Sequence, residues 1–366
     1  MELGPCQHHS VDVLRPTERM NVTNQDGADL LSDHLRAGVP HNTLSDLELI
    51  SRDLIEAFGL RYSEDVPHLS DPLLRWLDFR ERYIEPRPRE LPTSGGFEAR
   101  VPLAARSALA HFMQLARNGA DLNPYLSRRS KTFDVSGQKS QWRTDALWAD
   151  WGITHAHLTE APIAENMELS ESSDWLLFFI ASPDVLALID VRPHSEEGVF
   201  QAVDLVEKAF RSWPDYATRF EINVVQGEKP NAPPEAIARL RKGGVNQTLQ
   251  IDGKTYIPPG LGMTSASTAM RMTLMRDRLV QNANLLARDA ADPSSWIHQQ
   301  AIAKGILNPT FRLVVDGDSL GRQAGNTVWN LPRNVPVTSA QFFVQDRMLP
   351  PWAAERLVAW RATQNK

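Results

Sequence analysis

Apolar residues recur at helical spacing over three stretches in the first third of the chain. Residues 43–58 carry one such stripe, and Gly59 follows it as a stop signal. The patterns over residues 72–83 and 101–118 predict two further helices. Three prolines lie within residues 85–92, and each disfavours helical geometry in the residue before it, so we expect this segment to be extended.

The middle of the chain changes to short apolar runs separated by turn residues, which is typical of strands. Strands are predicted at residues 155–158, 175–182, 185–191 and 220–225. Ser182-Pro183-Asp184 predicts a tight turn between the second and third of these strands, because proline is favoured early in turns. An amphipathic helix is expected over residues 195–213.

The last third begins with a hairpin signal. Asp252-Gly253 at the centre of residues 249–257 is the dipeptide preferred in two-residue hairpin turns. A loop at 258–262 precedes a helix with an apolar stripe from Met272 to Leu286. The final part contains apolar runs at 311–315 and 342–344 and a terminal helix over 351–361.

These patterns predict an α+β fold with a helical N-terminal unit, a small antiparallel sheet with a packed helix in the centre, and a mixed, basic C-terminal unit. The expected divisions are a poorly ordered lead at 1–40, a helical unit at 41–135, an α+β unit at 136–228 and a basic hairpin-plus-helix unit at 229–366.

Composition places the 366-residue chain among globular proteins, with 42% hydrophobic and 23% charged residues. No apolar run approaches the roughly 20 residues of a membrane span, and residues 1–21 contain no apolar core of a signal peptide. We therefore expect a cytoplasmic protein with no membrane partner. The single cysteine, Cys6, excludes an internal disulfide and a cysteine-based zinc site.

The segment richest in candidate chemistry is the first predicted strand, which contains His155 and His157. Side chains alternate along a strand, so both imidazoles should point to the same face. The third predicted strand ends with Arg192 and His194 close behind it. If these strands are neighbours, three histidines and an arginine meet, which suits acid–base cleavage of a phosphodiester. The alternative is that the histidines only make hydrogen bonds in a half-buried sheet.

A strand with basic residues, an apolar hairpin and a last strand ending in Arg or His resemble the core of RelE/ParE-type toxins. The resemblance covers residues 150–226. It implies a small antiparallel sheet with helices on one side and metal-independent cleavage of mRNA. It also implies that His155 or His157 acts as acid or base, that Arg192 stabilises the phosphorane charge, and that His194 is the partner acid or base.

The same histidines could instead bind a metal. His155, His157 and His194, with Asp150 or Asp190, would offer three nitrogen ligands and a carboxylate to zinc or another divalent ion. A metal-dependent hydrolase is therefore the rival enzyme class. The metal-independent interpretation needs no cofactor.

Charge is unevenly distributed along the chain. Residues 229–290 contain nine Lys or Arg against four Asp or Glu, a net charge of +5, which leaves −11 for the rest of a chain whose total is −6. Such a segment favours a polyanionic partner, above all RNA. The candidate nucleic-acid-binding residues are Arg239, Arg241, Lys242, Arg271 and Arg278.

Two glycine pairs near these cations, Gly243-Gly244 and the loop Gly260-Leu261-Gly262, could bring backbone N–H groups to a phosphate. The tryptophans Trp142, Trp148 and Trp151 could stack on bases, although core packing is the commoner role. No serine-hydrolase elbow, zincin motif, dinucleotide fingerprint or EF-hand loop is present.

The leading hypothesis is thus a metal-independent ribonuclease of toxin or phage-defence type, with an antitoxin-like protein inhibitor as a further candidate partner. The alternative from another class is a non-catalytic nucleic-acid-binding or protein-binding component.

Overall fold

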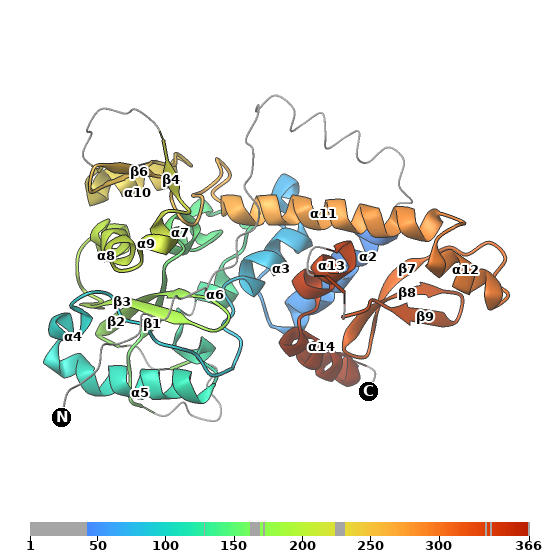
Figure 1. Cartoon of the computed structure of the whole chain (residues 1–366), viewed down its shortest axis with the longest axis horizontal. Helices are drawn as coiled ribbons and strands as arrows, with labels where there is room; N and C mark the ends of the chain where they lie inside the picture. The colour runs from blue at the N-terminus through green and yellow to red at the C-terminus, as the bar shows by residue number, and fades with distance from the viewer. Residues whose placement is uncertain are drawn as a thin grey trace, which may run out of the picture.

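The computed structural model describes residues 42–127, 129–161, 169–170, 173–223, 231–333, 335–336 and 339–364. The predicted lead at 1–40 lies outside these ranges, as does Lys229 of the basic segment. The described chain folds into helices and three antiparallel sheets, which confirms the α+β class (Figure 1).

The α-helices are α2 (Asn42–Ala57), α3 (Pro72–Arg80), α4 (Phe97–Arg100), α5 (Arg106–Asn118), α6 (Arg129–Thr132), α7 (Ala146–Trp151), α8 (Asp204–Ser212), α9 (Pro214–Ala217), α10 (Pro234–Lys242), α11 (Met270–Ala291), α12 (Trp296–Ala303), α13 (Ala340–Met348) and α14 (Pro351–Gln364). The strands are β1 (Thr154–His157), β2 (Trp175–Ala181), β3 (Leu186–Pro193), β4 (Glu221–Ile222), β5 (Leu249–Ile251), β6 (Lys254–Tyr256), β7 (Arg312–Asp316), β8 (Ser319–Ala324) and β9 (Thr327–Asn330). The 3₁₀ turns are η2 (Pro67–Leu69), η3 (Leu103–Ala105), η4 (Asn123–Tyr125), η5 (Ser140–Trp142) and η6 (Val199–Gln201).

The two ends of the described chain pack together in one part of the molecule, which we call the terminal lobe. Helices α2 and α3 contact α11 and α13, and α2 also contacts α14 and β7, so that all share one apolar core. These elements lie together at the right of Figure 1. Trp76 of α3 joins the two ends, because its ring centroid lies 5.6 Å from that of Phe58 and 5.9 Å from that of Trp352 in α14.

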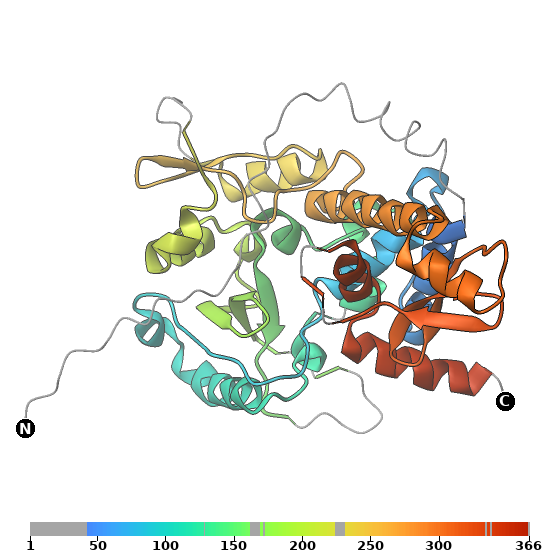
Figure 2. The same ribbon diagram turned by 45° about the vertical axis from the view of Figure 1, so that its right-hand side comes forward.

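Most residues between these ends, from about Ile84 to Tyr256, form the central lobe around the sheet β1-β2-β3, whereas Val135, Trp148 and Ala149 pack in the terminal-lobe core. Strand β2 is apolar throughout because both of its faces are covered. Leu177 and Phe179 pack with the core that includes α5, whereas Leu176 and Phe178 pack with the core that includes α8 and the β5–β6 hairpin. Figure 2 shows α5 and α8 on opposite sides of the strands.

The proline-rich segment at 85–92 continues this sheet in an extended form. Glu90 and Thr93 form parallel bridges to Val185 and Leu188 at the β3 edge. The backbone N–H of Glu90 donates to the carbonyl oxygen of Asp184, and the N–H of Leu188 donates to the carbonyl oxygen of Pro92. The edge of β3 is therefore paired rather than exposed.

Several elements begin later than the hydrophobic pattern predicts. The helix expected at 195–213 begins only at Asp204, because Gly198 is left-handed with φ 73° and Ala202 is extended. The helix expected at 101–118 becomes η3 and then α5 from Arg106, since Pro102 holds Val101 extended. Of the strand expected at 220–225, only Glu221–Ile222 pairs, and Val224 and Val225 lie outside the described residues.

The β5–β6 hairpin and the β2–β3 turn form where predicted. Asp252 and Gly253 both have positive φ, 50° and 75°, as a two-residue hairpin of the Asn-Gly or Asp-Gly type requires. Of the late apolar runs, residues 312–316 form β7, and residues 342–344 lie within α13.

The lobes group the elements differently from the four consecutive units expected from the sequence. Residues 42–83 pack with the C-terminal helices, whereas Phe97 to Leu126 pack on the central sheet. Helix α10 and the β5–β6 hairpin belong to the central lobe, whereas α11 onward belongs to the terminal lobe. Apolar surfaces far apart in sequence are buried against each other, which a linear division cannot show.

Candidate active site: a histidine cluster beside the central sheet

The two histidines of β1 point to the same face of the sheet, as the alternation predicts. His155 pairs with Phe178 and His157 with Leu176, and both partners belong to the core on the α8 side. Ala156 between them packs in the core on the α5 side.

His194 reaches the same place from the other edge of the sheet. Its backbone N–H donates to the carbonyl oxygen of Asp174 at 2.7 Å, which ties the end of β3 to the start of β2. The His194 ring stacks on that of His157, with centroids 5.6 Å apart and planes inclined by 29°. The His155 and His157 centroids are 6.1 Å apart, so the structure brings all three imidazoles together.

Phe200 of η6 packs against two of these rings. Its centroid lies 5.1 Å from that of His155 and 6.5 Å from that of His194. The apolar pattern of residues 195–213 places Phe200 on the buried side of the expected helix. In the sequence, only its position soon after His194 could have indicated that it belongs to the site.

The three imidazoles differ in their exposure to solvent. His155 is buried at 9% exposure, His157 is half-buried and His194 is exposed. A substrate arriving from solvent would therefore reach His194 and His157 first, with His155 behind them.

Arg192 lies beside this cluster but is engaged in an ion network. Its Nε donates to Asp190 at 3.1 Å, its Nη1 donates to Glu196 at 2.9 Å, and its Nη2 donates to Asp204. The Lys208 ammonium binds the same Asp190 and Asp204, at 2.7 and 2.6 Å. No local sequence pattern indicates this network, because its carboxylates lie on β3, in the turn after it and on α8.

The carboxylates around Arg192 balance its charge. Burial alone would raise the pKa of Asp190, but Lys208 and Arg192 outweigh that effect and hold the pKa below its ordinary value. Burial likewise would lower the pKa of Arg192, and its hydrogen bonds and charge interactions with Asp204 and Asp190 raise it overall. Arg192 is thus a permanent cation that must exchange a carboxylate to hold a phosphate.

The five candidate RNA-binding cations do not form one surface. Arg239 and Lys242 are exposed on α10, whereas Arg241 of the same helix is buried. The Arg271 guanidinium carbon lies 3.7 Å from the ring centroid of Trp148, and burial lowers the pKa of Arg271. Arg278 lies over the ring of Phe343, at 4.7 Å, in the terminal lobe.

Backbone groups of both glycine pairs take part in structural contacts. The Gly260 N–H donates to the backbone carbonyl oxygen of Asp150 at 2.9 Å, and the Gly262 N–H donates to that of Ala149 at 3.0 Å. The loop therefore closes the end of α7 instead of presenting an anion site. Gly243 and Gly244 N–H groups donate to carbonyl oxygens within the last turn of α10.

Two of the three tryptophans near the histidine strand are core residues. Trp148 and Trp151 are 4% and 2% exposed and lie under Arg271 and Arg241, whereas Trp142 is 38% exposed. Buried rings cannot stack on bases, so the structure does not support a three-tryptophan platform.

The alternative metal site would use the same residues. Across the ranges that the structure describes, no group of three His, Cys, Asp or Glu side chains is arranged to hold a metal ion. His155, His157 and His194 approach through ring faces and edges, and Asp150 is bound instead by Arg241 at 2.8 Å.

No protein-family model, curated protein or solved structure matches this chain. The resemblance of residues 150–226 to RelE/ParE-type toxins therefore stays a prediction. Among the helices of the described ranges, none has the length and apolar character needed to cross a membrane.

Proposed function

We propose that this chain is a metal-independent ribonuclease of toxin or phage-defence type, in which His157 and His194 are the acid–base pair. The observation that carries the proposal is the contact between these two imidazoles, one half-buried and one exposed, at the end of the central sheet. Imidazole is the side chain whose ordinary pKa lies nearest neutrality, so one ring can accept a proton while another donates one.

The proposed reaction is an attack of the ribose 2′-hydroxyl on the adjacent phosphorus. One imidazole removes the hydroxyl proton as the new P–O bond forms. The other imidazole donates a proton to the 5′-oxygen as the original P–O bond breaks. The products are a 2′,3′-cyclic phosphate and a 5′-hydroxyl, and neither step requires an oxidant or a metal.

The ring geometry specifies where the phosphate would bind. The ring centroids lie 5.6 Å apart and the ring planes are inclined by only 29°, so the two imidazoles are in contact and the phosphate would bind at their nitrogen-bearing edges. His155, behind His157 and against Phe200, would be a positioning residue.

Cations on α10 offer a path for the RNA backbone. Arg241 binds the carbonyl oxygen of Phe200, which attaches α10 directly to the histidine cluster. Arg239 and Lys242 are exposed on that helix and would contact phosphates on either side of the cleavage point.

The test is incubation of the purified full chain with matched RNA and single-stranded DNA, with and without EDTA. We expect EDTA-resistant cleavage of RNA alone, since DNA lacks the 2′-hydroxyl. His157→Ala and His194→Ala should each abolish cleavage, whereas His68→Ala, an exposed histidine in the terminal lobe, should not.

Cleavage of DNA, loss of activity in EDTA, or full activity in both His157→Ala and His194→Ala would contradict this mechanism. Absence of RNA cleavage by the wild-type chain would contradict the ribonuclease proposal itself and favour a non-catalytic binding component. The far-ultraviolet circular dichroism and melting temperature of each variant show whether it is folded.

A further inference from the structure

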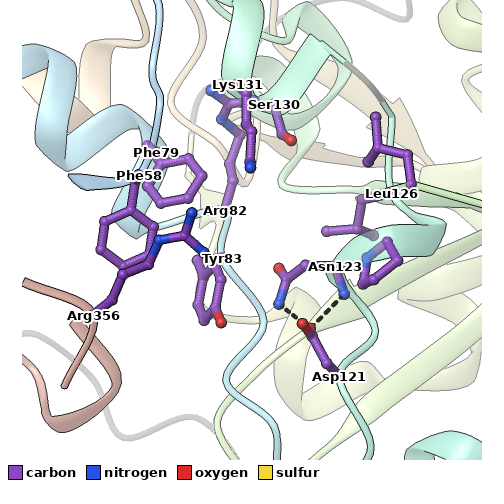
Figure 3. Close-up of a pocket in the computed structure, with 12 residues that line it drawn as sticks. Phe58, Phe79, Arg82, Tyr83, Asp121, Asn123, Leu126, Ser130, Lys131 and Arg356 are labelled. Atoms are coloured by element: carbon purple, nitrogen blue, oxygen red, sulfur yellow. Dashed lines mark hydrogen bonds between the residues drawn. The ribbon is translucent and has the colours of Figure 1, made fainter. Parts of the chain in front are cut away.

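A cavity of about 250 Å³ opens between the terminal and central lobes (Figure 3). Phe58, Phe79 and Tyr83 line it from the terminal-lobe side, and Asn123 and Leu126 line it from the central-lobe side. Leu126 forms a β-bridge with Ala156 of β1, whose side chain faces the α5 core and not the histidine cluster. The cavity and the cluster are therefore separate sites.

One wall of the cavity is aromatic and firmly packed. Tyr83 stacks on Trp352 with ring centroids 3.9 Å apart and planes inclined by 19°, which fixes its orientation. Phe58 and Phe79 pack edge-on or tilted against Tyr83 at 6.3 and 5.8 Å. Phe58 and Phe79 are only 3% and 4% exposed and support Tyr83 from the core, so the half-buried Tyr83 ring is the aromatic surface left for a flat ligand. Its fixed orientation means that little side-chain freedom is lost on binding.

Three cations from separate segments line the cavity. Arg82 is buried and held by Asp78, to whose carbonyl oxygen its Nε donates at 2.9 Å. Arg356 of α14 is exposed, donates from Nε to the carbonyl oxygen of Ala57 at 2.8 Å and lies 4.9 Å from the ring centroid of Phe58. Lys131 is the third cation.

The opposite side of the cavity carries a carboxylate on a rigid support. The side chain of Asn123 accepts from the Ile84 N–H at 2.9 Å and donates to the Ile84 carbonyl at 2.7 Å. Asn123 also donates twice to Asp121, and both bonds end on Oδ1. Figure 3 shows these two residues across the cavity from Arg356. Asp121, which is exposed, thus retains a second oxygen as an acceptor for a ligand N–H.

We propose that this cavity binds a nucleoside monophosphate whose base carries an exocyclic amine. The base would lie against Tyr83, its amine would donate to Asp121, and the phosphate would bind Arg356 and Lys131. The volume lies just below the range of about 300–1,000 Å³ that is typical of drug-sized ligands, so the ligand is small and its phosphate reaches solvent.

A ligand in this cavity would contact both lobes at once. Phe58, Phe79 and Arg356 belong to the terminal lobe, and Asp121 and Leu126 belong to the central lobe. Occupancy would therefore stabilise the present arrangement of the lobes, which makes the melting temperature a direct readout of binding.

The test is calorimetric titration and thermal melting of the full chain with AMP, CMP, UMP and inorganic phosphate. We expect AMP or CMP to bind with a dissociation constant below about 100 µM and to raise the melting temperature. UMP, whose base has no amine, and phosphate should each bind at least about tenfold more weakly.

Three variants and one matched control separate the contacts. Arg356→Ala should weaken AMP binding by about tenfold or more, and Arg356→Lys should retain most of it, because the phosphate needs the charge. Asp121→Asn should remove the preference for AMP or CMP over UMP. Arg288→Ala, an exposed arginine on α11, should bind as the wild type does.

His157→Ala, which removes the proposed ribonuclease activity, should still bind the nucleotide, so failure of one proposal is distinguishable from failure of the other. No heat and no thermal shift with any nucleotide at millimolar concentration would overturn the proposal. Phosphate binding as tight as AMP binding, or AMP binding unchanged in both Arg356→Ala and Asp121→Asn, would overturn it too.

Discussion

The guanidinium of Arg241 and the carboxylate of Asp150, 91 positions apart in sequence, form a buried ion pair at 2.8 Å. The Arg241 Nη1 also donates to the carbonyl oxygen of Phe200 at 2.6 Å, and its guanidinium carbon lies 4.2 Å from the ring centroid of Trp151. Burial raises the pKa of Asp150, although Arg241 acts in the opposite direction. One arginine thus connects α10, α7 and the turn that carries Phe200.

Arg241→Met should destabilise the fold strongly. Removing one partner leaves the buried Asp150 carboxylate uncompensated, at a cost of about 3–5 kcal/mol in the free energy of unfolding. Chemical denaturation measures this cost. Arg239→Met, on the exposed side of the same helix, should change it by less than about 0.5 kcal/mol. The pair Asp150→Asn with Arg241→Met should cost clearly less than the sum of the single changes, and strict additivity would contradict the pairing.

Glu81 should make the free energy of unfolding depend on pH. Burial would raise its pKa, but Arg80, Arg347 and Arg271 outweigh this effect and hold the pKa at about 2. A depressed carboxyl pKa adds stability above the unfolded value near 4.5, and this stability is lost as the pH falls toward 2. Glu81→Gln should therefore cost on the order of 3 kcal/mol at pH 7, and the difference from wild type should shrink below pH 4.5. Denaturant unfolding of both proteins at a series of pH values measures this difference. A difference that does not change with pH would contradict the assignment of a lowered pKa to Glu81.

Gly260→Ala should be one of the more damaging glycine substitutions. A β-carbon there would lie 2.3 Å from the carbonyl oxygen of Ala149, which is backbone and cannot turn aside. We expect a loss of about 2 kcal/mol or more in the free energy of unfolding, from steric overlap at the end of α7. Gly305→Ala is the matched control, because it meets nothing within 4 Å and costs only the left-handed strain at φ 85°, about 1 kcal/mol. Equal losses in the two variants would argue against close packing at Gly260.

Charge reversal on α10 tests the proposed path of the RNA. Arg239→Glu with Lys242→Glu should weaken RNA binding and reduce the slope of log affinity against log salt by about 1–2, because two phosphate contacts are lost. Fluorescence anisotropy at several salt concentrations measures this slope. The control is Arg288→Glu on α11, which should leave the slope unchanged, and equal effects from both helices would point to non-specific attraction.

An acid–base pair of imidazoles predicts a bell-shaped dependence of RNA cleavage rate on pH, with its maximum between the two apparent pKa values of the pair. Single-turnover cleavage from pH 5 to 8 measures it. His155→Asn should reduce the rate and shift the profile, as expected of a positioning residue, without shifting the profile of RNA binding. A rate that rises steadily with pH would contradict the assignment of one histidine as the acid.

The sequence determined the features that depend on neighbouring residues. Alternation along β1 was enough to place His155 and His157 on one face, and Asp252-Gly253 was enough to predict the β5–β6 turn. The α+β class followed from periodicities of 3.6 and 2, which are properties of the local backbone. Two helices begin later than the apolar pattern predicts, because Gly198 and Pro102 interrupt helical geometry there.

Only the tertiary structure decided which side chains remain available for binding. Arg239 and Arg241 are two positions apart on one helix, yet one is exposed and the other is buried against Asp150. Arg192 likewise has three carboxylate partners, and Glu196 and Asp204 lie beyond the end of its own strand. The meeting of His194 with His157, and of Arg356 with Phe58, depends on long-range burial of apolar surface, which sets distances that no local pattern contains.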